Sequence, residues 1–419
     1  MRLLILSVFI ASAGYAQSGE TVKLDINEVV NIVSERNYEV LEEALKTYQA
    51  KESIKVARAG LLPSLNIWKA ASAVIDPAAL YGMIRDIVPF LVPSNWFRLK
   101  QNKQLYLVKN EGYRALWANQ VMTAKGLYYQ ALLDRSLLAT INEVLEKVAE
   151  LETMITTRER LGYLPAGSSL VIKDKRKVLE SDRMEMALLV RKDERKLTMS
   201  LGLDASTQLD LTSVSPLPDD IFQPIDSDLF EFRMLDVSPE YRQYDHLLKV
   251  VPSIKKEIYY GFLGASSSSR GTAGGIFDDL PESDGLGFGL GPQVRIVSTQ
   301  APIFEKQRQA VEQILKRNLQ DLVDEWNADL TRKDNFEQRL KDINEEWRLV
   351  KSRLNLGKET NLLEITNILE RMMGVKAAQS AIRTRFYQSK DRLDRMLFAG
   401  DYTKEPANIE EIRNGMVQR

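Results

Sequence analysis

The chain has 419 residues, with no cysteine, one histidine and 27% charged residues. This composition excludes zinc sites built from Cys and His, thiol nucleophiles, disulfide frameworks and histidine-based triads. Because 57 Lys and Arg oppose 58 Asp and Glu, for a net charge of −1, the sequence does not predict a nucleic-acid-binding surface.

The N-terminal segment is typical of a secretory signal peptide. Met1-Arg2 precedes an apolar run, Leu3–Ala11, and small residues follow up to Ala16. We expect cleavage after Ala13 or Ala16 and leave residues 1–16 out of the fold. No cysteine follows, so a lipid-anchored lipoprotein is not expected. No later stretch reaches the roughly 18 apolar residues of a membrane helix, so membrane insertion would need strands or an interfacial helix.

The first half of the mature chain, residues 17–214, contains an atypical insert at 64–96. Alternation begins at Ser64 and soon stops, and Asp76-Pro77 has the form of an N-cap followed by proline at the first helical position. The apolar residues that follow have helical spacing: Leu80, Met83, Ile84, Ile87 and Val88. We predict a short apolar helix, which could be an interfacial anchor, a plug or a core helix. A poorly alternating strand pair is the alternative.

Long helices are predicted at 97–163 and 168–202. Proline is absent from 94–164 and from 166–215, and apolar residues recur at alternating steps of three and four, as in a coiled-coil seam: Ile141, Val144, Val148, Leu151 and Ile155. A helix on the order of 95 Å long, at 1.5 Å per residue, must pair or bundle because alone it cannot bury this seam. The intervening turn holds Gly162, Pro165 and Gly167, residue types that a tight turn needs.

The second half repeats the first at a displacement of 201 residues. Leu24-Asp25-Ile26 lies over Ile225-Asp226-Ser227, and Gly60-Leu61-Leu62 lies over Gly261-Phe262-Leu263. We therefore predict a second repeat over 215–400, joined to the first near the proline-rich stretch 215–226 and followed by a tail at 401–419. Its long helices are expected at 303–356 and 360–399.

The insert of the second half, 258–299, is predicted to form β-strands. From Gly285 to Ser298, one parity carries apolar residues and the other carries glycine or polar residues. This alternation fits a tilted membrane strand of about 9–11 residues. Its membrane-facing residues would be Leu286, Phe288, Leu290, Val294 and Ile296. A soluble hairpin half buried on a core is the alternative.

Several motifs, in order, resemble the TolC-like outer membrane efflux protein family (outer membrane factors). They are Leu24-Asp25-Ile26 opening a helix, Ala57–Leu65 leaving it, Ala301–Phe304 entering a long helix, and Arg353–Glu364 at a helical tip. The resemblance runs from Leu24 to Gly400. It implies a mainly α fold of long antiparallel coiled-coil helices in two structural repeats. In a homotrimer these helices would form an α-barrel, with a small β portion as a partial or complete membrane β-barrel.

The resemblance implies a passive channel and not an enzyme. The expected function is an outer-membrane exit duct of a tripartite efflux or type I secretion system that spans into the periplasm. Expected partners are a periplasmic adaptor protein, an inner-membrane pump and outer membrane lipid. If the first insert gave no strands, a trimer would supply six, fewer than the eight of the smallest single-chain membrane barrels. The alternative is therefore a periplasmic or membrane-associated helical scaffold, derived from that family, with an incomplete, non-conducting barrel.

The two helical tips are the candidate sites for adaptor docking and gating. By resemblance they comprise Arg160, Leu161, Gly162, Gly167 and Ser168 in the first tip, and Arg353, Leu354, Gly357 and Thr360 in the second. The family commonly places an acid after the tip glycine, which gives a trimer a ring of like charge facing cations. Glu359 and Glu364 are the candidates for this ring, and plain turns are the alternative reading.

No catalytic, metal or cofactor site is predicted. His246 is a lone histidine on an ordinary helix, where a packed or solvated side chain is expected. The glycines of Gly285–Gly289 fall at every second residue and lack the phosphate-cradling pattern before a helix.

Overall fold

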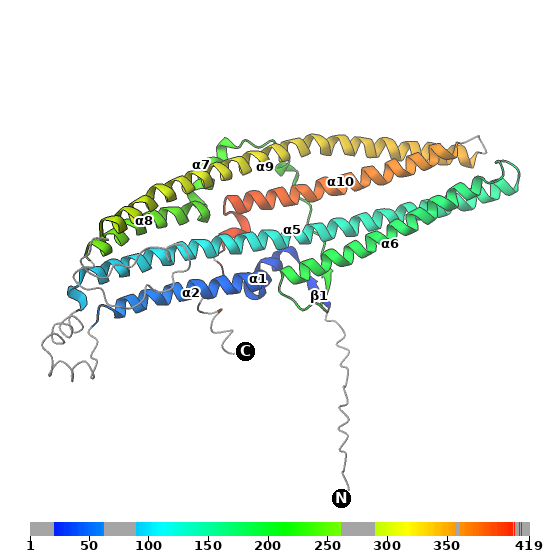
Figure 1. Ribbon diagram of the computed structural model, residues 1–419. Helices are drawn as coiled ribbons and strands as arrows, with labels where there is room; N and C mark the ends of the chain where they lie inside the picture. Colours follow the sequence, from blue (N-terminus) through cyan, green and yellow to red (C-terminus); the bar gives the residue numbers. More distant parts are fainter. Residues whose placement is uncertain are drawn as a thin grey trace, which may run out of the picture.

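The computed structural model describes residues 21–62, 89–260, 290–356, 361–404, 406, 410 and 412. These residues form an elongated body in which the longest helices run side by side along one axis (Figure 1). The described helices are α1 (Ile26–Arg36), α2 (Tyr38–Ala59), α5 (Pro93–Arg160), α6 (Ser168–Ser200), α7 (Asp228–Val237), α8 (Pro239–Tyr260), α9 (Leu290–Asn355) and α10 (Leu362–Met396). Short 3₁₀ turns are η1 (Pro89–Leu91), η2 (Asp219–Ile221) and η4 (Gly400–Thr403).

The long helices α5 and α9 are the frame of the body. At one end α5 forms an antiparallel hairpin with α6, and α9 forms one with α10. Towards the other end α2 packs on α5, and α8 packs on both α5 and α9 (Figure 1). Strands β1 (Thr21–Leu24) and β2 (Gln208–Leu211) pair in parallel near the middle. None of the described helices is long and apolar enough to cross a membrane. The predicted fold of long antiparallel helices is therefore confirmed.

The coiled-coil seam lies where the sequence pattern placed it. Val144, Val148 and Leu151 of α5 are fully or almost fully buried, and they share one core with Val350 and Leu369 of the second hairpin. Because apolar residues at steps of three and four fall on one face of a helix, each hairpin buries its seam against the other.

The two halves are structural repeats. Helix α2 spans Tyr38–Ala59 and α8 spans Pro239–Tyr260, so both ends recur 201 residues later, at the displacement read from the sequence. Helices α1 and α7 also end 201 residues apart, at Arg36 and Val237. The division of the chain near residue 215 remains a prediction.

Helix α1 begins at Ile26 because its N-terminus carries a capping box. The Asp25 carboxylate accepts from the Asn27 amide at 2.9 Å, and the Glu28 carboxylate accepts from the Asp25 amide at 3.1 Å. Such a box satisfies amides that have no partner within the helix. The buried face of α1 packs on α5, where Trp117 Nε1 donates to Ser34 Oγ at 2.8 Å.

The predicted membrane-facing strand is wrong for Leu290, Val294 and Ile296, which lie in α9. The burial shows why, because Val294, Val297 and Phe304 are buried at helical spacing while Ile296 is exposed. Residues 294 and 296 would share a face in a strand but not in a helix. Leu286 and Phe288 lie outside the described residues. So do the residues of the predicted short helix: Leu80, Met83, Ile84, Ile87 and Val88.

Each repeat has a place, called a joint here, where the end of one helix meets the start of another helix that continues in the same direction. The first joint lies between α6 and α2, and the second lies between α10 and α8. At the first joint, between α6 and α2, Asn37 Nδ2 donates to the Ser200 carbonyl at 2.7 Å. Gly202 lies so close that a Cβ there would be 2.1 Å from the Arg36 carbonyl oxygen, and its φ of +68° also favours glycine. The first joint is therefore closed.

The second joint, between α10 and α8, is bridged by an ion pair. Arg395, in the last turn of α10, pairs with Glu240, in the first turn of α8. Each charge also complements the dipole of its own helix end. The pair links the end of α10 to the start of α8.

A buried cation fastens the C-terminal turn η4 to the helices. Lys125 Nζ of α5 lies 2.9 Å from Asp391 Oδ1 of α10 and 2.8 Å from Asp401 Oδ2 of η4. Tyr402 donates its hydroxyl to Asp391 Oδ2 at 2.7 Å. Burial raises the pKa of Asp391, while Lys125 and the Tyr402 hydroxyl oppose that rise. Charges removed from water in this way need all of their partners.

Two carboxyl groups are buried together where α5 meets α6. Asp134 is 1% exposed and Asp193 is 4% exposed. Gln130 donates to Asp134 Oδ1 at 2.9 Å and Lys196 donates to Asp193 Oδ1 at 2.5 Å, but among the described residues no donor reaches Asp134 Oδ2. Burial, together with the neighbouring Asp193 carboxylate, raises the pKa of Asp134 to about 6. One proton shared between the two acids is the arrangement that this geometry favours.

Candidate functional site

The first hairpin tip joins α5 to α6 through a helix ending built on glycine. After α5 ends at Arg160, Gly162 has a φ of +79°, and the Tyr163 amide donates back to the Arg158 carbonyl at 2.9 Å. The Gly162 amide donates to the Glu159 carbonyl at 3.1 Å. This pair of bonds is a Schellman motif, in which glycine takes the left-handed conformation. The predicted tip glycine thus has a defined structural role.

Glu159 holds the two sides of this tip together. Its Oε1 accepts from the Gly167 amide at 2.6 Å, and its Oε2 accepts from the Ser169 amide at 2.8 Å. These bonds, with that of the Ser169 side chain, lower the pKa of Glu159. Glu159 was missed in the sequence. The signal for it was that Gly167, the N-cap of α6, has no side chain with which to cap the helix.

The second tip is partly outside the described residues. Helix α9 ends at Asn355, and α10 begins after Asn361, whose side chain accepts from the Leu363 amide at 2.9 Å. Gly357, Glu359 and Thr360 lie outside the description. The other candidate acid, Glu364, lies in the first turn of α10 and pairs with Arg353 across the tip at 3.8 Å. Both side chains are about half exposed, so this pair stabilises the tip only slightly.

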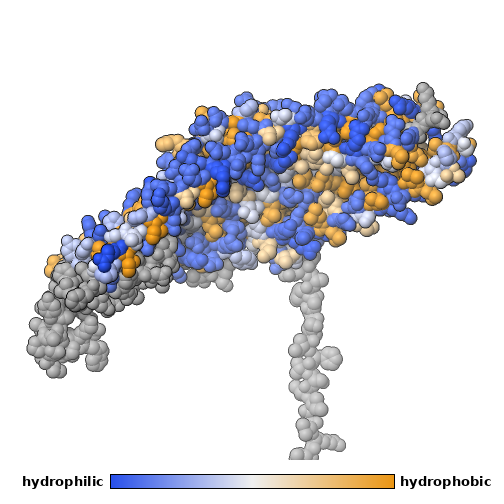
Figure 2. Space-filling view, turned by 45° about the horizontal axis from the view of Figure 1, so that its top comes forward, coloured by the Kyte–Doolittle hydropathy of each residue, from blue (hydrophilic) through white to orange (hydrophobic). Residues whose placement is uncertain are grey.

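The tips present apolar side chains to solvent. Leu161, Tyr163 and Leu170 are 64%, 74% and 64% exposed on the first tip. Leu356 and Leu363 are 70% and 65% exposed on the second. Apolar residues also interrupt the otherwise hydrophilic surface over the half of the body that carries the tips (Figure 2). Exposed apolar clusters of this kind mark surfaces that meet a partner.

Two of the predicted tip residues do not project from the surface. Ser168 and Leu354 are both buried, and Leu354 belongs to the seam between the hairpins. Arg160, Leu161 and Arg353 are exposed. Ser168 and Leu354 therefore contribute to the packing of the tips, while the other three side chains face solvent.

The two hairpins are tied to each other near the tips by ion pairs. Lys351 of α9 lies 2.7 Å from Glu150 of α5, and Lys175 of α6 lies 2.5 Å from Glu370 of α10. Lys376 of α10 pairs with Glu143 of α5, and Lys147 joins the same carboxylate. Because these groups are partly exposed, each pair contributes about 1 kcal/mol or less and can be exchanged for other partners.

Helix α6 carries an apolar stripe that nothing in the described chain covers. Its exposed members are Leu170, Val171, Val178, Met184, Leu188 and Leu189. The opposite face of α6 is buried on α5 through Ile172, Leu179 and Leu197. A long helix that is apolar on two faces needs a second packing partner.

The end opposite the tips carries exposed aromatic residues. Phe97 of α5 stacks on Tyr260 of α8 with ring centroids 5.7 Å apart, and Trp96 and Tyr259 are about half exposed beside them. The segments 63–88 and 261–289, which lie outside the described residues, connect at this end of the body. Tryptophan and tyrosine gather at membrane–water interfaces because their rings are amphipathic.

Among the described residues, no group of three or more His, Cys, Asp or Glu side chains could hold a metal ion. His246 contacts Gln104 through Nδ1 at 3.3 Å, and burial lowers its pKa. This is the packed environment expected for a lone structural histidine.

Comparison with solved structures establishes the fold. A membrane protein from Pseudomonas aeruginosa is 15% identical, covers 91% of this chain and 92% of its own, and superposes with a TM-score of 0.69. The Campylobacter jejuni CmeC outer membrane channel is 12% identical, with 94% and 88% covered and a TM-score of 0.69. The open state of the Neisseria gonorrhoeae MtrE outer membrane channel is 13% identical, with 90% and 89% covered and a TM-score of 0.65.

No protein-family model and no curated protein matches the sequence. The chain nevertheless has the TolC-like outer membrane factor fold along nearly its whole length, as the motifs predicted. CmeC and MtrE are channels and not enzymes.

Proposed function

We propose that this chain is the outer-membrane exit duct of a tripartite efflux or type I secretion system and works as a passive homotrimer. The observation that carries the proposal is the fold shared with outer membrane channels over about nine-tenths of both chains. The long hairpins would span into the periplasm, and the signal peptide predicted at 1–16 would export the chain.

The homotrimer is supported by the uncovered stripe of α6. A second copy of the chain offers helices of matching length, and packing α6 against one of them would bury residues such as Met184 and Leu188. Burial of apolar surface contributes roughly 25 cal/mol per Å², so a stripe of this length gives substantial association energy. Repeating the same contact around a closed ring is the usual form of a cyclic oligomer.

Adaptor docking is supported by the tips. Their exposed residues, including Leu161 and Leu363, combine apolar contact area with rigid turns, since Glu159 and the Schellman motif fix the first tip. A periplasmic adaptor that contacts these residues, with its inner-membrane pump, would separate the hairpins and open the duct. The partly exposed ion pairs near the tips are the contacts that such an opening would exchange.

Outer membrane placement is supported by the aromatic end of the body. The rings of Trp96, Tyr259 and Tyr260 fit the level of lipid headgroups. This orientation puts the tips at the opposite, periplasmic end.

The test combines mass in detergent with single-channel conductance in a planar bilayer. We expect a trimer that gives discrete conductance steps. Leu188→Glu, in the α6 stripe, should release monomers, whereas the control Phe232→Glu, at an exposed apolar residue of α7, should leave the trimer intact. A chain that extracts without detergent and gives no steps would overturn the proposal and indicate a non-conducting scaffold.

A further inference from the structure

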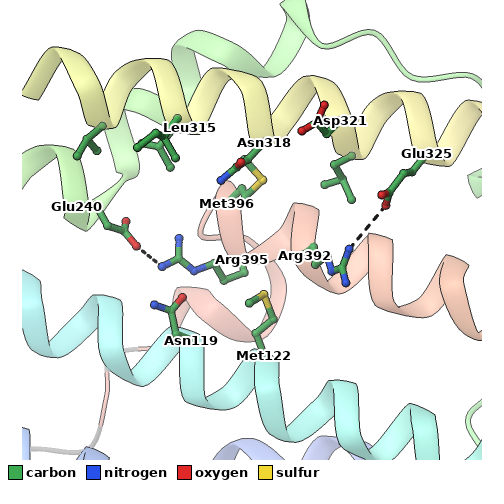
Figure 3. Close-up of a pocket in the computed structure, with 13 residues that line it drawn as sticks. Asn119, Met122, Glu240, Leu315, Asn318, Asp321, Glu325, Arg392, Arg395 and Met396 are labelled. Carbon is green, nitrogen blue, oxygen red and sulfur yellow. Dashed lines mark hydrogen bonds and ion pairs between the residues drawn. The ribbon is translucent and has the colours of Figure 1, made fainter.

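A cavity of about 520 Å³ lies at the second joint. Figure 3 shows it between α5 below and α9 above, with residues of the last turns of α10 and the first turn of α8 beside it. Met122, Leu315, Leu322 and Met396 contribute apolar side chains to its lining. Its size falls within the range of about 300–1,000 Å³ that is typical of small-molecule sites.

The cavity exists because the two repeats close their joints differently. At the first joint a direct hydrogen bond from Asn37 to Ser200 and the close approach of Gly202 to Arg36 bring the helix ends into contact. At the second joint the helix ends are bridged by the Arg395–Glu240 ion pair, whose side chains reach across open space (Figure 3). The site therefore lies at the joint of the second repeat.

The polar lining has unused hydrogen-bonding capacity. Arg395 is 6% exposed, and although it pairs with Glu240, its Nε–H has no acceptor within the described residues. Asn119 and Asn318 line the same cavity, and both are exposed to solvent, so their amides can exchange water for a ligand. The Arg395 Nε–H is different, because a buried donor without an acceptor destabilises a protein until an acceptor reaches it.

The charges around the cavity select against an ionic ligand. Two guanidinium groups, Arg392 and Arg395, face three carboxylates, Glu240, Asp321 and Glu325. Burial alone would raise the pKa of Glu240, but the adjacent Arg395 lowers it, so the carboxylate stays ionised. Arg392 pairs with Glu325 at 3.7 Å on the rim, where both are more than half exposed. An anion would meet excess negative charge, and a cation would compete with paired guanidinium groups.

We propose that this cavity binds a small neutral amphiphile, with an alkyl or aryl body on the apolar lining and a carbonyl oxygen that accepts hydrogen bonds from Arg395 and Asn318. The carbonyl satisfies donors that the chain leaves unused, and the body displaces water from Met122, Leu315 and Leu322. All of the lining residues belong to one chain, so ligand binding there does not require that the protein conduct solutes.

Three probes that differ in the head group test this specificity. Hexanamide, hexanoate and hexylammonium are titrated against the full-length protein in lipid nanodiscs, because detergent would compete for the cavity, and binding is followed by ligand-observed NMR. We expect saturable binding of hexanamide, at least threefold tighter than that of either ion. No saturable binding of hexanamide, or tighter binding of a charged probe, would overturn the proposal.

Variants locate the site. Ile314→Trp fills the cavity from an exposed position on α9, and we expect it to weaken hexanamide binding at least fivefold. Ile303→Trp is the matched control, since Ile303 lies on the same helix with a similar exposure, 44% against 48% for Ile314, and does not line the cavity. Equal binding to both variants would refute the location.

A final variant tests the electrostatic reasoning. Glu240→Gln removes one carboxylate and frees a guanidinium nitrogen of Arg395. We expect the preference for hexanamide over hexanoate to fall about tenfold, because an anion can then replace the lost charge. An unchanged preference would show that Glu240 and Arg395 do not set the specificity, and would overturn the proposed recognition.

Discussion

Replacing Asp134 with asparagine should stabilise the protein at high pH and leave its stability nearly unchanged at low pH. The carboxyl groups of Asp134 and Asp193 are buried together, and no donor among the described residues reaches Asp134 Oδ2. When Asp134 is protonated, it can donate to Asp193. When it loses that proton, two negative charges share one site. The amide of asparagine keeps a donor there at every pH.

The magnitude follows from the pKa of Asp134, which is about 6 in place of an ordinary 3.8. A raised carboxyl pKa means that the folded protein holds its proton more tightly than the unfolded chain. Stability therefore falls as pH rises from about 4 to about 6 and stays lower above that, by at most about 3 kcal/mol. Burial alone would raise the pKa of Asp193, but Lys196 and the Asp134 proton lower it, which offsets part of this loss. We expect Asp134→Asn to gain about 1–3 kcal/mol at pH 8.

The assay is guanidinium unfolding at pH 4 and pH 8, followed by helical circular dichroism. The variant should have a higher unfolding midpoint than the wild type at pH 8, and the difference should be small at pH 4, where Asp134 is protonated in the folded protein. Asp174→Asn, at an exposed carboxylate on the same helix as Asp193, is the control and should change neither midpoint. A gain of equal size at both values of pH, or no gain at pH 8, would refute the shared proton.

Three further substitutions test other parts of the structure. Gly202→Ala should destabilise the chain by several kcal/mol in the same unfolding assay, because its Cβ would meet the Arg36 carbonyl, whereas Gly126→Ala, a control in open helical space, should stabilise it by about 0.5–1 kcal/mol. Lys125→Met should lower the free energy of unfolding by about 3–5 kcal/mol, because two buried carboxylates lose their cation; a loss below 1 kcal/mol would contradict that role. Glu364→Lys should change cation block or adaptor coupling, and unchanged conductance together with unchanged export would exclude its gating role.

The long helices were predictable because their signals are local and repeated. The steps of three and four between Val144, Val148 and Leu151 recur over many turns, and each residue is buried where the period places it. The repeat was also readable, since a displacement of 201 residues matches both ends of α2 to those of α8. Patterns that extend over dozens of residues average out the exceptions.

The start of α9 was not predictable in the same way, because two periods compete there. Glycines at every second residue up to Gly291 produce alternation, and Val294 and Ile296 continue it. The helical set of Val294, Val297 and Phe304 is equally present in the sequence, and it is the set that the structure buries. Pro292, in the first turn of α9, does not interrupt the helix because amides there have no partner within it.

Contacts between distant residues were beyond the reach of the sequence. Arg395 and Glu240 are 155 positions apart, and Lys125 and Asp391 are 266 apart. Lys125, Asp391 and Arg395 are buried by the packing of several helices, which the sequence of a single helix does not show. The cavity at the second joint is lined by residues of four helices, so it cannot be predicted from the sequence of any one of them.

Helices α5 and α9 continue without a break past the two joints, so a rotation at the level of a joint displaces the distant tip of the hairpin. From the level of Met122, beside the second joint, to the end of α5 at Arg160 is about 60 Å at 1.5 Å per residue. A rotation of one degree at that level moves the tip by about 1 Å. Small differences in how the joints are filled or bridged are thereby magnified at the far end, so a side chain half a molecule away affects where the tips lie.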